Sequence, residues 1–568
     1  MDTKTLIVET VAAATKLPPH EIASILEVPK VPELGDFALP CFRLAAKLKK
    51  DPKLIAKDVA AHLKFPKGSA VKEAKVVGAY VNFFLNSSNL AETVLSEVFK
   101  EKESFGAGTK KKEKVMIEGF GQPNTHKAIH VGHLRNISLS DSLAKVLKFA
   151  GYPVVTADYV GDIGTHVAKV MWHMQKYHLL HEHQKQKNKG EWLGNLYAEA
   201  SKKVKDHPEY EKEVAETLQL LESGKDKDLT NLWKLTRIWS LQEFKRIYKQ
   251  LGVKFDIWFF ESQVEEAGKK IALELLKKKI ARKDQGALLV DLSAYDLDVY
   301  LILKSDGTSL YSTKDLELAK LKFEKYKIDR SIYVVGSEQS LYFKQLFKTL
   351  ELMGFKQASK CYHLAYELVM LATGKMSSRS GEVVLYSDLF EKAKDKALQE
   401  VKKRNPKLKK AEEIAEKIAL AALKYGMLKQ APSKVITFDW ERALEFQGDT
   451  GPYLQYSLVR ANKILEKVGK PNIKIDFNLL KAEQEVNLVK KILAFKEIVA
   501  KAAEQYAPYL VASYAFELTQ AFNEFYEKCP VAQADKNTKE ARTLLVWAFA
   551  QTLKNALNLL GIEEVSVM

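Results

Sequence analysis

The chain contains few cysteines and lacks the common phosphate-binding motifs. Its 568 residues include three cysteines, Cys41, Cys361 and Cys529, which are widely separated and form no C-x-x-C pair. This spacing argues against a disulfide framework and against a cysteine-based zinc site. No G-x-x-x-x-G-K-[ST] sequence is present, which excludes a P-loop enzyme, and "GFGQPN" (119–124) lacks the third glycine of the dinucleotide fingerprint. A nucleotide would therefore have to be held in another way.

Long apolar runs are also absent. No stretch of about 18 apolar residues occurs. The first residues, "MDTKTLIVETVAAATKLPPH", include an acid and have no long apolar core. These features predict neither a membrane span nor a signal peptide. We therefore expect a cytoplasmic protein without membrane association.

Positive charge is in excess, with a formal net charge of +17 at pH 7. An excess of this size indicates a polyanionic partner, most simply nucleic acid, although a lysine-rich surface without such a partner has the same composition. The chain is 46% hydrophobic and 28% charged, which is typical of a globular protein. A chain of this length exceeds one ordinary core, so several domains are expected.

Residues 1–105 form a first block with mixed signals. Segment 51–63 has helical periodicity, and 75–85, "KVVGAYVNFFL", is predicted to be a strand. The lysine-rich stretch that follows (106–114) is typical of a linker. An α+β domain over 1–105 is the prediction.

A second block, 106–400, begins as nucleotide-binding folds often do. A short strand (115–118), a Gly/Pro/Asn turn, a helix from about 132 to 150 and a strand within 152–164 form a βαβ unit. Further strands are predicted at 287–292, 299–304, 331–336 and 361–371, and the charged segment at about 170–280 is predicted to be a helical insertion. Residues 401–568 have a nearly all-helical pattern. The predicted fold class is α/β: a Rossmann-like parallel-sheet catalytic domain with a helical insertion, an α+β N-terminal domain and an all-α C-terminal domain.

Two histidines stand at the start of the first helix of the βαβ unit. His130 and His133 are three residues apart, so they share one helix face, and Gly132 allows a ligand to approach the backbone closely. A helix N-terminus favours anions, and two imidazoles add hydrogen-bond donors. A metal site would need a third ligand that this motif does not supply, and two unrelated surface histidines would have the same spacing.

The segment "GKMSSRSG" (374–381) has the composition of a loop that handles phosphate. It follows a predicted strand and places Lys375 and Arg379 beside two serines. An ordinary polar loop would have the same composition, so the segment carries little weight by itself.

In this order, "HVGH" (130–133) and "KMSSR" (375–379) resemble the HIGH and KMSKS motifs of class I aminoacyl-tRNA synthetases. The surrounding residues are similar to the arginyl-tRNA synthetase family. "QPNTHKAIHVGHLRN" (122–136) resembles its S-P-N-x-x-K-x-x-H-V-G-H-L-R-S, and "YVGDIGTH" (159–166) its N-x-x-G-D-W-G-T-Q. "SDGTSLYSTKDLELAK" (305–320) matches S-D-G-x-x-x-Y-x-T-x-D-x-A-x-A, with Glu317 where alanine is usual. Segments 33–40 and 438–461 resemble the family's N-terminal domain and the entry to its anticodon-binding domain.

The resemblance implies an arginine–tRNA ligase that forms arginyl-adenylate from arginine and ATP and transfers the arginyl group to the 3' end of tRNA(Arg). It implies Mg²⁺ that arrives with ATP, no protein-bound zinc, and a monomer. Such chemistry needs no covalent enzyme intermediate, so catalysis is positioning plus stabilisation of charge on phosphate oxygens. By resemblance, the catalytic residues are His130, His133, Lys127, Lys375 and Arg379. The ATP-binding residues are His130, Gly132, His133, Lys375, Met376, Ser377 and Ser378.

A guanidinium substrate needs a carboxylate presented edge-on. Tyr311 and Asp315 are four residues apart, so at a helix start they would face one cleft, although a helix cap with a packed tyrosine would show the same spacing. The family has an acid five residues before the Asn124 position, where this chain has Gly119. Glu118, one residue earlier, would reach the substrate amino group if the turn bulges. By resemblance, the arginine site comprises Asn124, Tyr311, Asp315, Gln339 and Glu118.

Contacts with tRNA are also implied by the resemblance. Exposed aromatic rings stack on the splayed bases of RNA loops. Tyr453, Tyr456 and Met568 are candidate tRNA contacts, with helix packing as the alternative for the two tyrosines. The N-terminal domain resembles the module that contacts the tRNA elbow, in which "VNFF" (81–84) is interpreted as a core strand.

The late loop departs from the KMSKS motif at one position. The motif has a second lysine two residues after the methionine, where this chain has Ser378, followed by Arg379. Arginyl enzymes without that lysine often carry one just before the HIGH motif, and here Lys127 lies three residues ahead of His130. Our hypothesis is that Lys127 supplies the missing cation from the other side of the phosphates.

Other functions fit parts of the sequence less well. A cysteinyl enzyme would hold zinc with cysteines, which three dispersed cysteines disfavour. A tRNA-binding paralogue without activity would usually lose the two histidines or Lys375, and all three are present. A pure RNA-binding scaffold would not need Tyr311 and Asp315 in register.

Overall fold

The computed structural model describes residues 3–27, 29, 34–66, 69–371 and 384–567. Two compact units make up the chain: residues 1–105, 460–494 and 518–552 form the first, and 106–459, 495–517 and 553–568 the second. The predicted loop residues and the terminal methionine lie outside the described residues: Lys375, Met376, Ser377, Ser378, Arg379 and Met568.

The first unit contains a small antiparallel sheet of strand order β1-β3-β2. Its early elements are α1 Thr3–Thr15, α2 Pro19–Ile25, β1 Phe37–Pro40, α3 Ala45–Leu48, α4 Pro52–His62, β2 Val71–Val77, β3 Tyr80–Leu85 and α5 Ser87–Glu101. The single strand predicted over 75–85 was wrong: the chain reverses at Gly78, whose φ of +62° suits glycine, and β2 and β3 form a hairpin.

The helical part of the first unit comprises α18 Glu483–Leu493 and portions of three long helices, α17 Gly451–Val468, α20 Tyr509–Lys528 and α21 Lys536–Leu559. Helix α5 packs on α18. The side chain of Asp36 accepts from the Leu85 amide (2.7 Å) and pairs with Lys490 of α18. The Asp36 carboxylate therefore fastens the small sheet to this helix.

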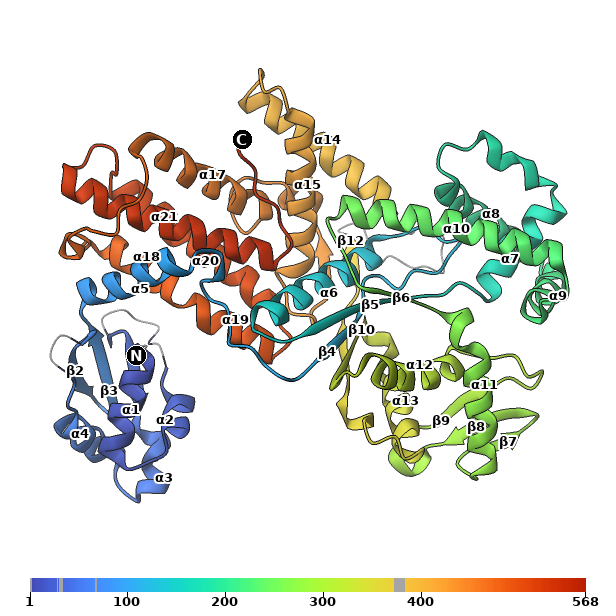
Figure 1. Cartoon of the computed structure of the whole chain (residues 1–568), viewed down its shortest axis with the longest axis horizontal. Helices are drawn as coiled ribbons and strands as arrows, with labels where there is room; N and C mark the ends of the chain where they lie inside the picture. The colour runs from blue at the N-terminus through green and yellow to red at the C-terminus, as the bar shows by residue number, and fades with distance from the viewer. Residues whose placement is uncertain (1–2, 28, 30–33, 67–68, 372–383, 568) are drawn as a thin grey trace. The chain divides into compact units, whose positions relative to one another are not determined.

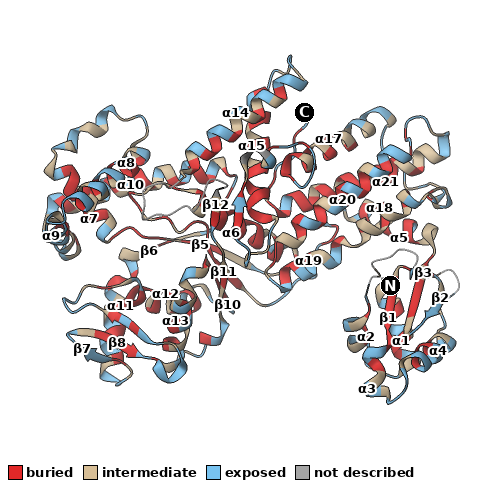
Figure 2. Cartoon of the chain, turned by 180° about the vertical axis from the view of Figure 1, so that it is seen from behind, coloured by how far each residue is buried: buried red, intermediate tan, exposed pale blue. Residues whose placement is uncertain are grey.

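The second unit is built on a five-stranded parallel sheet of order β11-β10-β4-β5-β6. Its strands are β4 Val115–Gly119, β5 Val154–Val160, β6 Ile257–Phe260, β10 Arg330–Gly336 and β11 Cys361–Tyr366. Helix α6 (Val131–Phe149) crosses between β4 and β5, as predicted. It is buried along most of its length, as Figure 2 shows in red. Residues of α6 are thus held by the core on several sides.

A helical insertion follows β5, as predicted (Figure 1), but the predicted end near residue 280 was wrong, because β6 at 257–260 belongs to the central sheet. It comprises α7 Thr165–Lys176, α8 Lys189–Asp206, α9 Tyr210–Ser223 and α10 Lys227–Gln250. After β6 come α11 Glu261–Lys277, β7 Arg282–Asp284, β8 Ala287–Asp291, β9 Val299–Leu303, α12 Tyr311–Tyr326 and α13 Ser340–Leu352. The predicted strands at 287–292 and 299–304 exist as β8 and β9, but they form a separate antiparallel sheet with β7.

The remaining elements are mostly helical: β12 Val369–Leu371, α14 Tyr386–Arg404, α15 Ala411–Leu428, β13 Ile436–Phe438, α16 Trp440–Ala443 and α19 Phe495–Glu504. The strand predicted over 361–371 is two strands, β11 and β12, and β12 pairs with β13 rather than with the central sheet. The α/β class with a parallel sheet, a helical insertion, an α+β N-terminal part and a helical C-terminal part is confirmed. Among the described residues, no helix is long and apolar enough to cross a membrane.

Candidate active site

Three neighbouring strands of the parallel sheet deliver the predicted site residues to one edge. Glu118 lies in β4, Asn124 follows β4 and bridges to Gly161 just after β5, and Gln339 follows β10. Since β10, β4 and β5 are adjacent and parallel, their carboxyl ends meet at the same edge. In open α/β sheets this edge is where ligands bind.

The turn after β4 has an unusual backbone. Phe120, Gly121 and Gln122 all have positive φ angles, of +65°, +110° and +50°. Non-glycine residues pay roughly 1 kcal/mol or more for such conformations, so the surroundings must hold them there. The turn between Glu118 and Asn124 is therefore a strained segment rather than a regular continuation of β4.

The Glu118 side chain, however, has partners inside the protein. Its carboxylate is 3% exposed, pairs with the fully buried Lys322 and accepts from Nε2 of Gln122 at 3.3 Å. Lys322 also lies 3.8 Å from the centroid of the Tyr333 ring. These contacts give Glu118 a structural role, and its predicted contact with a substrate amino group stays a prediction.

His130 and His133 form a reciprocal cap at the start of α6. The Gly132 amide donates to Nδ1 of His130 (3.1 Å), and the His130 amide donates to Nδ1 of His133 (3.0 Å). A backbone amide can only donate, so both rings carry their proton on Nε2. Burial, with the nearby Lys127 charge, lowers the pKa of His130 to about 4. Burial, then His130 and then Lys127, lowers the pKa of His133 well below its usual value. The rings are thus neutral Nε2–H donors at pH 7.

Gly132 has a second reason to be glycine. A Cβ there would lie 2.9 Å from Cε1 and 3.0 Å from Nδ1 of the His130 ring. A side chain at this position would push the imidazole out of its cap, besides blocking the approach of a ligand to the backbone.

Lys127 lies close to the histidine pair. Its ammonium is 4.8 Å from the centroid of the Tyr197 ring in α8, and its charge contributes to the lowered pKa values of both histidines.

The segment that begins at Val384 runs alongside the start of α6. The Val131 amide donates to the Val384 carbonyl (3.1 Å), and the Tyr386 amide donates to the Ile129 carbonyl (2.9 Å). Residues 384–386 therefore lie directly beside the two histidines.

Arg135, which sequence reasoning did not single out, secures the other flank of the predicted loop at 372–383. The guanidinium of this α6 residue is 1% exposed and donates to the carbonyls of Pro432 and Lys434 (3.0 and 2.9 Å). These residues precede β13, which pairs with β12, the strand that enters the loop. The described residues on both sides of 372–383 are thus tied to the histidine helix or to the residues just before it.

Asp315 is the most distinctive carboxylate of the site. It is 9% exposed, its Oδ2 accepts from the Tyr342 hydroxyl at 2.5 Å, and its Oδ1 is buried without a hydrogen bond from any described residue. Burial raises the pKa of Asp315 to about 7, with the charge of Glu118 adding to the effect and the Tyr342 hydrogen bond opposing it. A buried acceptor without a donor is suited to a ligand that brings both charge and N–H groups.

Tyr311 begins helix α12, one turn before Asp315, as predicted. Its ring is 53% exposed and packs edge-on against Tyr342, with centroids 4.9 Å apart. Tyr342 therefore touches both Tyr311 and Asp315, two of the predicted arginine-binding residues.

Two other predicted arginine-binding residues lie nearby along the sheet edge. The side chain of Asn124 lies over Gly161, where a Cβ on Gly161 would come within 2.1 Å of Oδ1 of Asn124. Gln339 is partly exposed just before α13.

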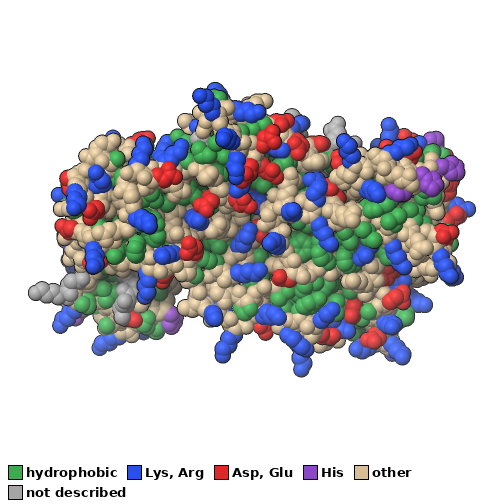
Figure 3. Space-filling model, turned by 45° about the horizontal axis from the view of Figure 1, so that its top comes forward, with side chains coloured by type: hydrophobic (Ala, Val, Ile, Leu, Met, Phe, Trp, Pro, Cys, Tyr) green, Lys and Arg blue, Asp and Glu red, His purple; other side chains and the backbone are tan. Residues whose placement is uncertain are grey.

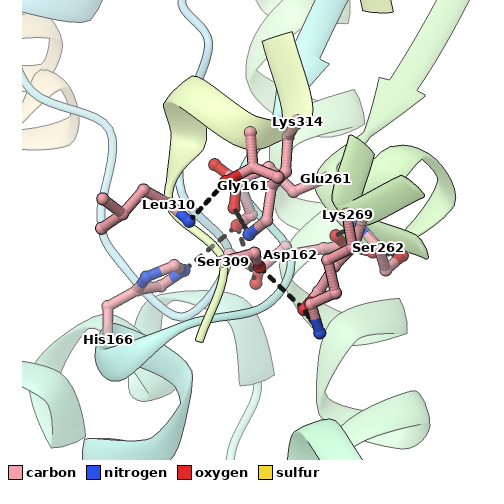
Figure 4. Close-up of polar contacts among 12 residues, drawn as sticks. Gly161, Asp162, His166, Glu261, Ser262, Lys269, Ser309, Leu310 and Lys314 are labelled. Carbon is pink, nitrogen blue, oxygen red and sulfur yellow. Dashed lines mark hydrogen bonds and ion pairs between the residues drawn. The ribbon is translucent and has the colours of Figure 1, made fainter. Parts of the chain in front are cut away.

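Further charged residues meet at this edge, and sequence reasoning missed them (Figure 4). Lys314 pairs with Glu261 (2.8 Å), and the fully buried Asp162 accepts from the Ser262 hydroxyl at 2.7 Å. Burial raises the pKa of Glu261, opposed by Lys314, and the Glu261 charge contributes to the raised pKa of Asp315. Sequence reasoning missed Glu261 because β6, the strand that directly precedes it, falls inside the segment that was predicted to be helical.

Helix α10 of the insertion supports the site along one polar face. The residues on that face lie at helical spacing and are Trp233, Thr236, Arg237, Ser240 and Tyr248. Trp233 donates to the Asp162 carbonyl (2.7 Å), Arg237 pairs with the Asp162 carboxylate (2.7 Å), and Ser240 accepts from the His126 amide (3.0 Å). The insertion is therefore a support of the site, which its charged composition did not indicate.

The two candidate tRNA-binding tyrosines are partly buried in helix α17. Tyr453 lies 6.0 Å from the Phe516 ring, and Tyr456 lies 5.8 Å from the Arg404 guanidinium, each measured to ring centroids. These contacts favour the packing alternative for part of each ring. No group of three or more potential metal ligands occurs within the described ranges.

Comparison with known proteins places these features in a family. The model for "tRNA synthetases class I (R), catalytic domain" matches residues 94–440. "DALR anticodon binding domain" matches 454–568, and "Arginyl tRNA synthetase N terminal domain" matches 1–85. The chain belongs to the arginyl-tRNA synthetase family.

Individual relatives agree. An arginine–tRNA ligase of Halothermothrix orenii is 36% identical over 97% of this chain and 96% of its own length, and one of Clostridium perfringens is 35% identical over the full length of both. The arginyl-tRNA synthetase structure of Thermus thermophilus superposes with a TM-score of 0.84 at 29% identity over 99% of both chains. That of Plasmodium falciparum gives 0.79 at 20% identity over 100% of both, which supports the fold. The predicted family and its reaction, ATP-dependent ligation of arginine to tRNA, are confirmed.

Proposed function

We propose that this arginyl-tRNA synthetase binds arginine through the unpartnered Oδ1 of Asp315. The observation that carries the proposal is the half-satisfied, buried Asp315 carboxylate, with Tyr311 and Tyr342 beside it. An arginine guanidinium would supply the missing donors and the positive charge, and a shorter or neutral side chain would leave Oδ1 unpaired. Asn124 and Gln339, at the same sheet edge, are the proposed partners of the substrate's backbone groups.

ATP is the second substrate, and we propose that its phosphates lie at the start of α6. The arginine carboxylate attacks the α-phosphorus, the bond to the β-phosphate oxygen breaks, and pyrophosphate leaves. The Nε2–H groups of His130 and His133 would donate to phosphate oxygens, and Lys127 would add positive charge. Mg²⁺ would arrive with ATP. Lys375, Met376, Ser377, Ser378 and Arg379 are proposed as the other half of the phosphate clamp, supported by the attachment of the loop's described flanks beside His130.

The third substrate is tRNA(Arg), whose terminal ribose hydroxyl would attack the adenylate carbonyl and release AMP. A net charge of +17 supports phosphate contacts, and lysine and arginine side chains are spread over the face in Figure 3. Tyr453, Tyr456 and Met568 remain the proposed anticodon-side contacts. The division into domains 1–105, 106–400 and 401–568, a monomeric state and a cytoplasmic location are proposals of the same kind.

An amino-acid panel in a charging assay tests the proposed function. Purified protein, ATP, Mg²⁺ and total tRNA are incubated with each labelled amino acid in turn. Charged product with arginine alone supports the proposal. Charging of another amino acid, or no charged product at all, would overturn it.

A further inference from the structure

The strained turn Phe120–Gln122 is held at three consecutive residues. The Phe120 carbonyl accepts from the Tyr248 hydroxyl (2.7 Å), the Gly121 amide donates to Oδ1 of Asn136 (2.8 Å), and the Gln122 amide donates to Oδ1 of Asp158 (2.9 Å). These three partners come from α10, α6 and β5, so the turn is fixed from three sides. The Phe120, Gly121 and Gln122 backbone is thereby kept in a conformation that it would not adopt alone.

Asp158 and Tyr248 also contact each other. Oδ2 of Asp158 lies 2.8 Å from the Tyr248 oxygen, and both side chains are buried, at 0% and 3% exposure. The single Tyr248 proton cannot be given both to the Phe120 carbonyl and to a carboxylate. The geometry is satisfied if Asp158 is protonated, so that it donates to Tyr248 and Tyr248 donates to Phe120. Burial, reinforced by the Glu118 charge, raises the pKa of Asp158 well above its usual value, which agrees with this arrangement.

We propose that Asp158 and Tyr248 are positioning residues for adenylate formation, acting as a hydrogen-bond relay that holds the turn between β4 and Asn124. The relay runs from Asp158 through Tyr248 to the Phe120 carbonyl, while Oδ1 of Asp158 accepts a hydrogen bond from the Gln122 amide. The turn leads directly into Asn124 and, six residues later, His130, so a change in its backbone would move both. This inference rests on the proposed function of those residues.

The positions of Asn124 and His130 matter because a displacement of about 1 Å in groups that hold the substrates can lower the reaction rate on the order of 100-fold. Neither Asp158 nor Tyr248 needs to touch arginine or ATP for such an effect. Tyr248 belongs to α10, whose other contacts reach His126 and Asp162. The insertion therefore contributes one end of the relay.

Tyr248→Phe removes the relay hydroxyl, and the chain offers a matched control. Tyr425 is also buried, and its hydroxyl likewise contacts one carboxylate, Asp449 (2.5 Å), and one backbone carbonyl, that of Ala512 (3.1 Å). Tyr425→Phe therefore makes the same chemical change away from the turn. Asp158→Asn keeps one donor and one acceptor in place, whereas Asp158→Ala removes both.

Three readouts separate positioning from folding. Hydrogen exchange of segment 119–124 reports on the Gly121 and Gln122 amides without any activity. The rate of adenylate formation per active site and the tRNA Kd are measured beside it. We expect Tyr248→Phe and Asp158→Ala to lose protection in this segment and about 10- to 100-fold in kcat, with tRNA Kd unchanged. Asp158→Asn and Tyr425→Phe should keep both protection and kcat.

Three results would overturn the relay. The first is a Tyr248→Phe variant with the same hydrogen exchange and the same kcat as Tyr425→Phe. The second is an Asp158→Asn variant that loses as much kcat as Asp158→Ala, and the third is tRNA binding that weakens together with kcat. Failure of the proposed function looks different, because the wild-type protein would then charge no arginine. The hydrogen-exchange comparison of the four variants tests the relay in that case as well.

Discussion

The Tyr342 hydroxyl donates a 2.5 Å hydrogen bond to Oδ2 of Asp315 and leaves Oδ1 of the same buried carboxylate without a donor among the described residues. One oxygen is thus fixed in place by the protein, and the other is buried without a hydrogen-bond donor among the described residues. Burial is the main reason that the carboxyl group is hard to ionise, and a guanidinium at Oδ1 would bring both the missing donors and an opposite charge.

Asp315→Asn should raise the arginine KM by about 100-fold and leave the ATP KM near the wild-type value, because a buried charged hydrogen bond to the guanidinium is lost. Steady-state pyrophosphate exchange with varied arginine and varied ATP measures both constants. Asp141→Asn, which neutralises a different buried carboxylate paired with Lys145, is the control. Equal losses for arginine and ATP in Asp315→Asn would indicate a folding defect instead.

Arginine affinity should depend on pH through Asp315. The pKa of this carboxyl is about 7 before arginine binds, and the guanidinium requires the ionised form. Binding therefore releases a proton, so affinity falls as pH drops below 7 and levels off above it. Between pH 8 and pH 6 we expect the arginine Kd to rise about tenfold. Calorimetry in buffers of different ionisation enthalpy measures the Kd and the proton release; a Kd constant over this range would contradict the prediction.

The neutral His130 should make the protein less stable in acid. Its folded pKa of about 4 lies below that of an unfolded histidine, so between pH 6.5 and 4 the unfolded chain binds more protons than the folded one. The contribution of His130 to the free energy of unfolding is complete above pH 6.5 and falls by about 3 kcal/mol as the pH drops to 4. His130→Asn, which preserves a helix-capping side chain, should flatten this part of the profile. Urea unfolding at several pH values compares the two proteins, and parallel profiles would refute the assignment.

Lys127→Ala should lower kcat for adenylate formation by about 100-fold while changing arginine affinity little, because the lost cation would act on phosphate charge in the transition state. Lys189→Ala is the matched control, since Lys189 also lies over an aromatic ring, that of Trp239 at 5.0 Å. Single-turnover kinetics with saturating ATP gives the rate constant of adenylate formation. An unchanged kcat in Lys127→Ala would remove this lysine from the phosphate clamp.

Binding of tRNA should weaken by about tenfold or more between 50 and 200 mM salt, because phosphate contacts by lysine and arginine release counterions. Fluorescence anisotropy with labelled tRNA measures the Kd at each salt concentration. A flat response would contradict a binding mode dominated by phosphate contacts.

Much of the fold followed from local patterns. The βαβ start and helix α6 were predicted from apolar strands and apolar helix spacing, and the helical insertion from its charged, helix-like sequence. The pairing of strands was harder to predict from the sequence. The patterns of β8 and β9 resemble those of any buried strand, and nothing in the local sequence shows that they pair with β7 in a separate sheet instead of joining the central sheet. The 75–85 hairpin was missed because a single glycine, Gly78, reverses the chain.

Some residues of the candidate site could likewise be predicted from local sequence, and others could not. His130, His133, Lys127 and Asp315 stand in short motifs whose residue types and spacing carry chemical meaning, so they were named from the sequence. Tyr248 and Arg237 were not, because each acts on a segment about 75 or more residues away and follows no motif of its own. Arg135 stands in the histidine motif, but its partners, Pro432 and Lys434, are far away in the sequence. The protonation states of Asp315 and the two histidines were also out of reach, since burial decides them.

The amino-acid sequence by itself determined the family, the reaction and the order of the catalytic motifs, because these depend on residue identity and spacing along the chain. Tertiary structure alone decided that Glu118 pairs with Lys322, that both histidines are neutral donors, and that Asp315 keeps one oxygen free of protein partners among the described residues. The physical reason is that hydrogen-bond partners and desolvation come from whichever segments the fold brings together, and these lie far apart in the sequence.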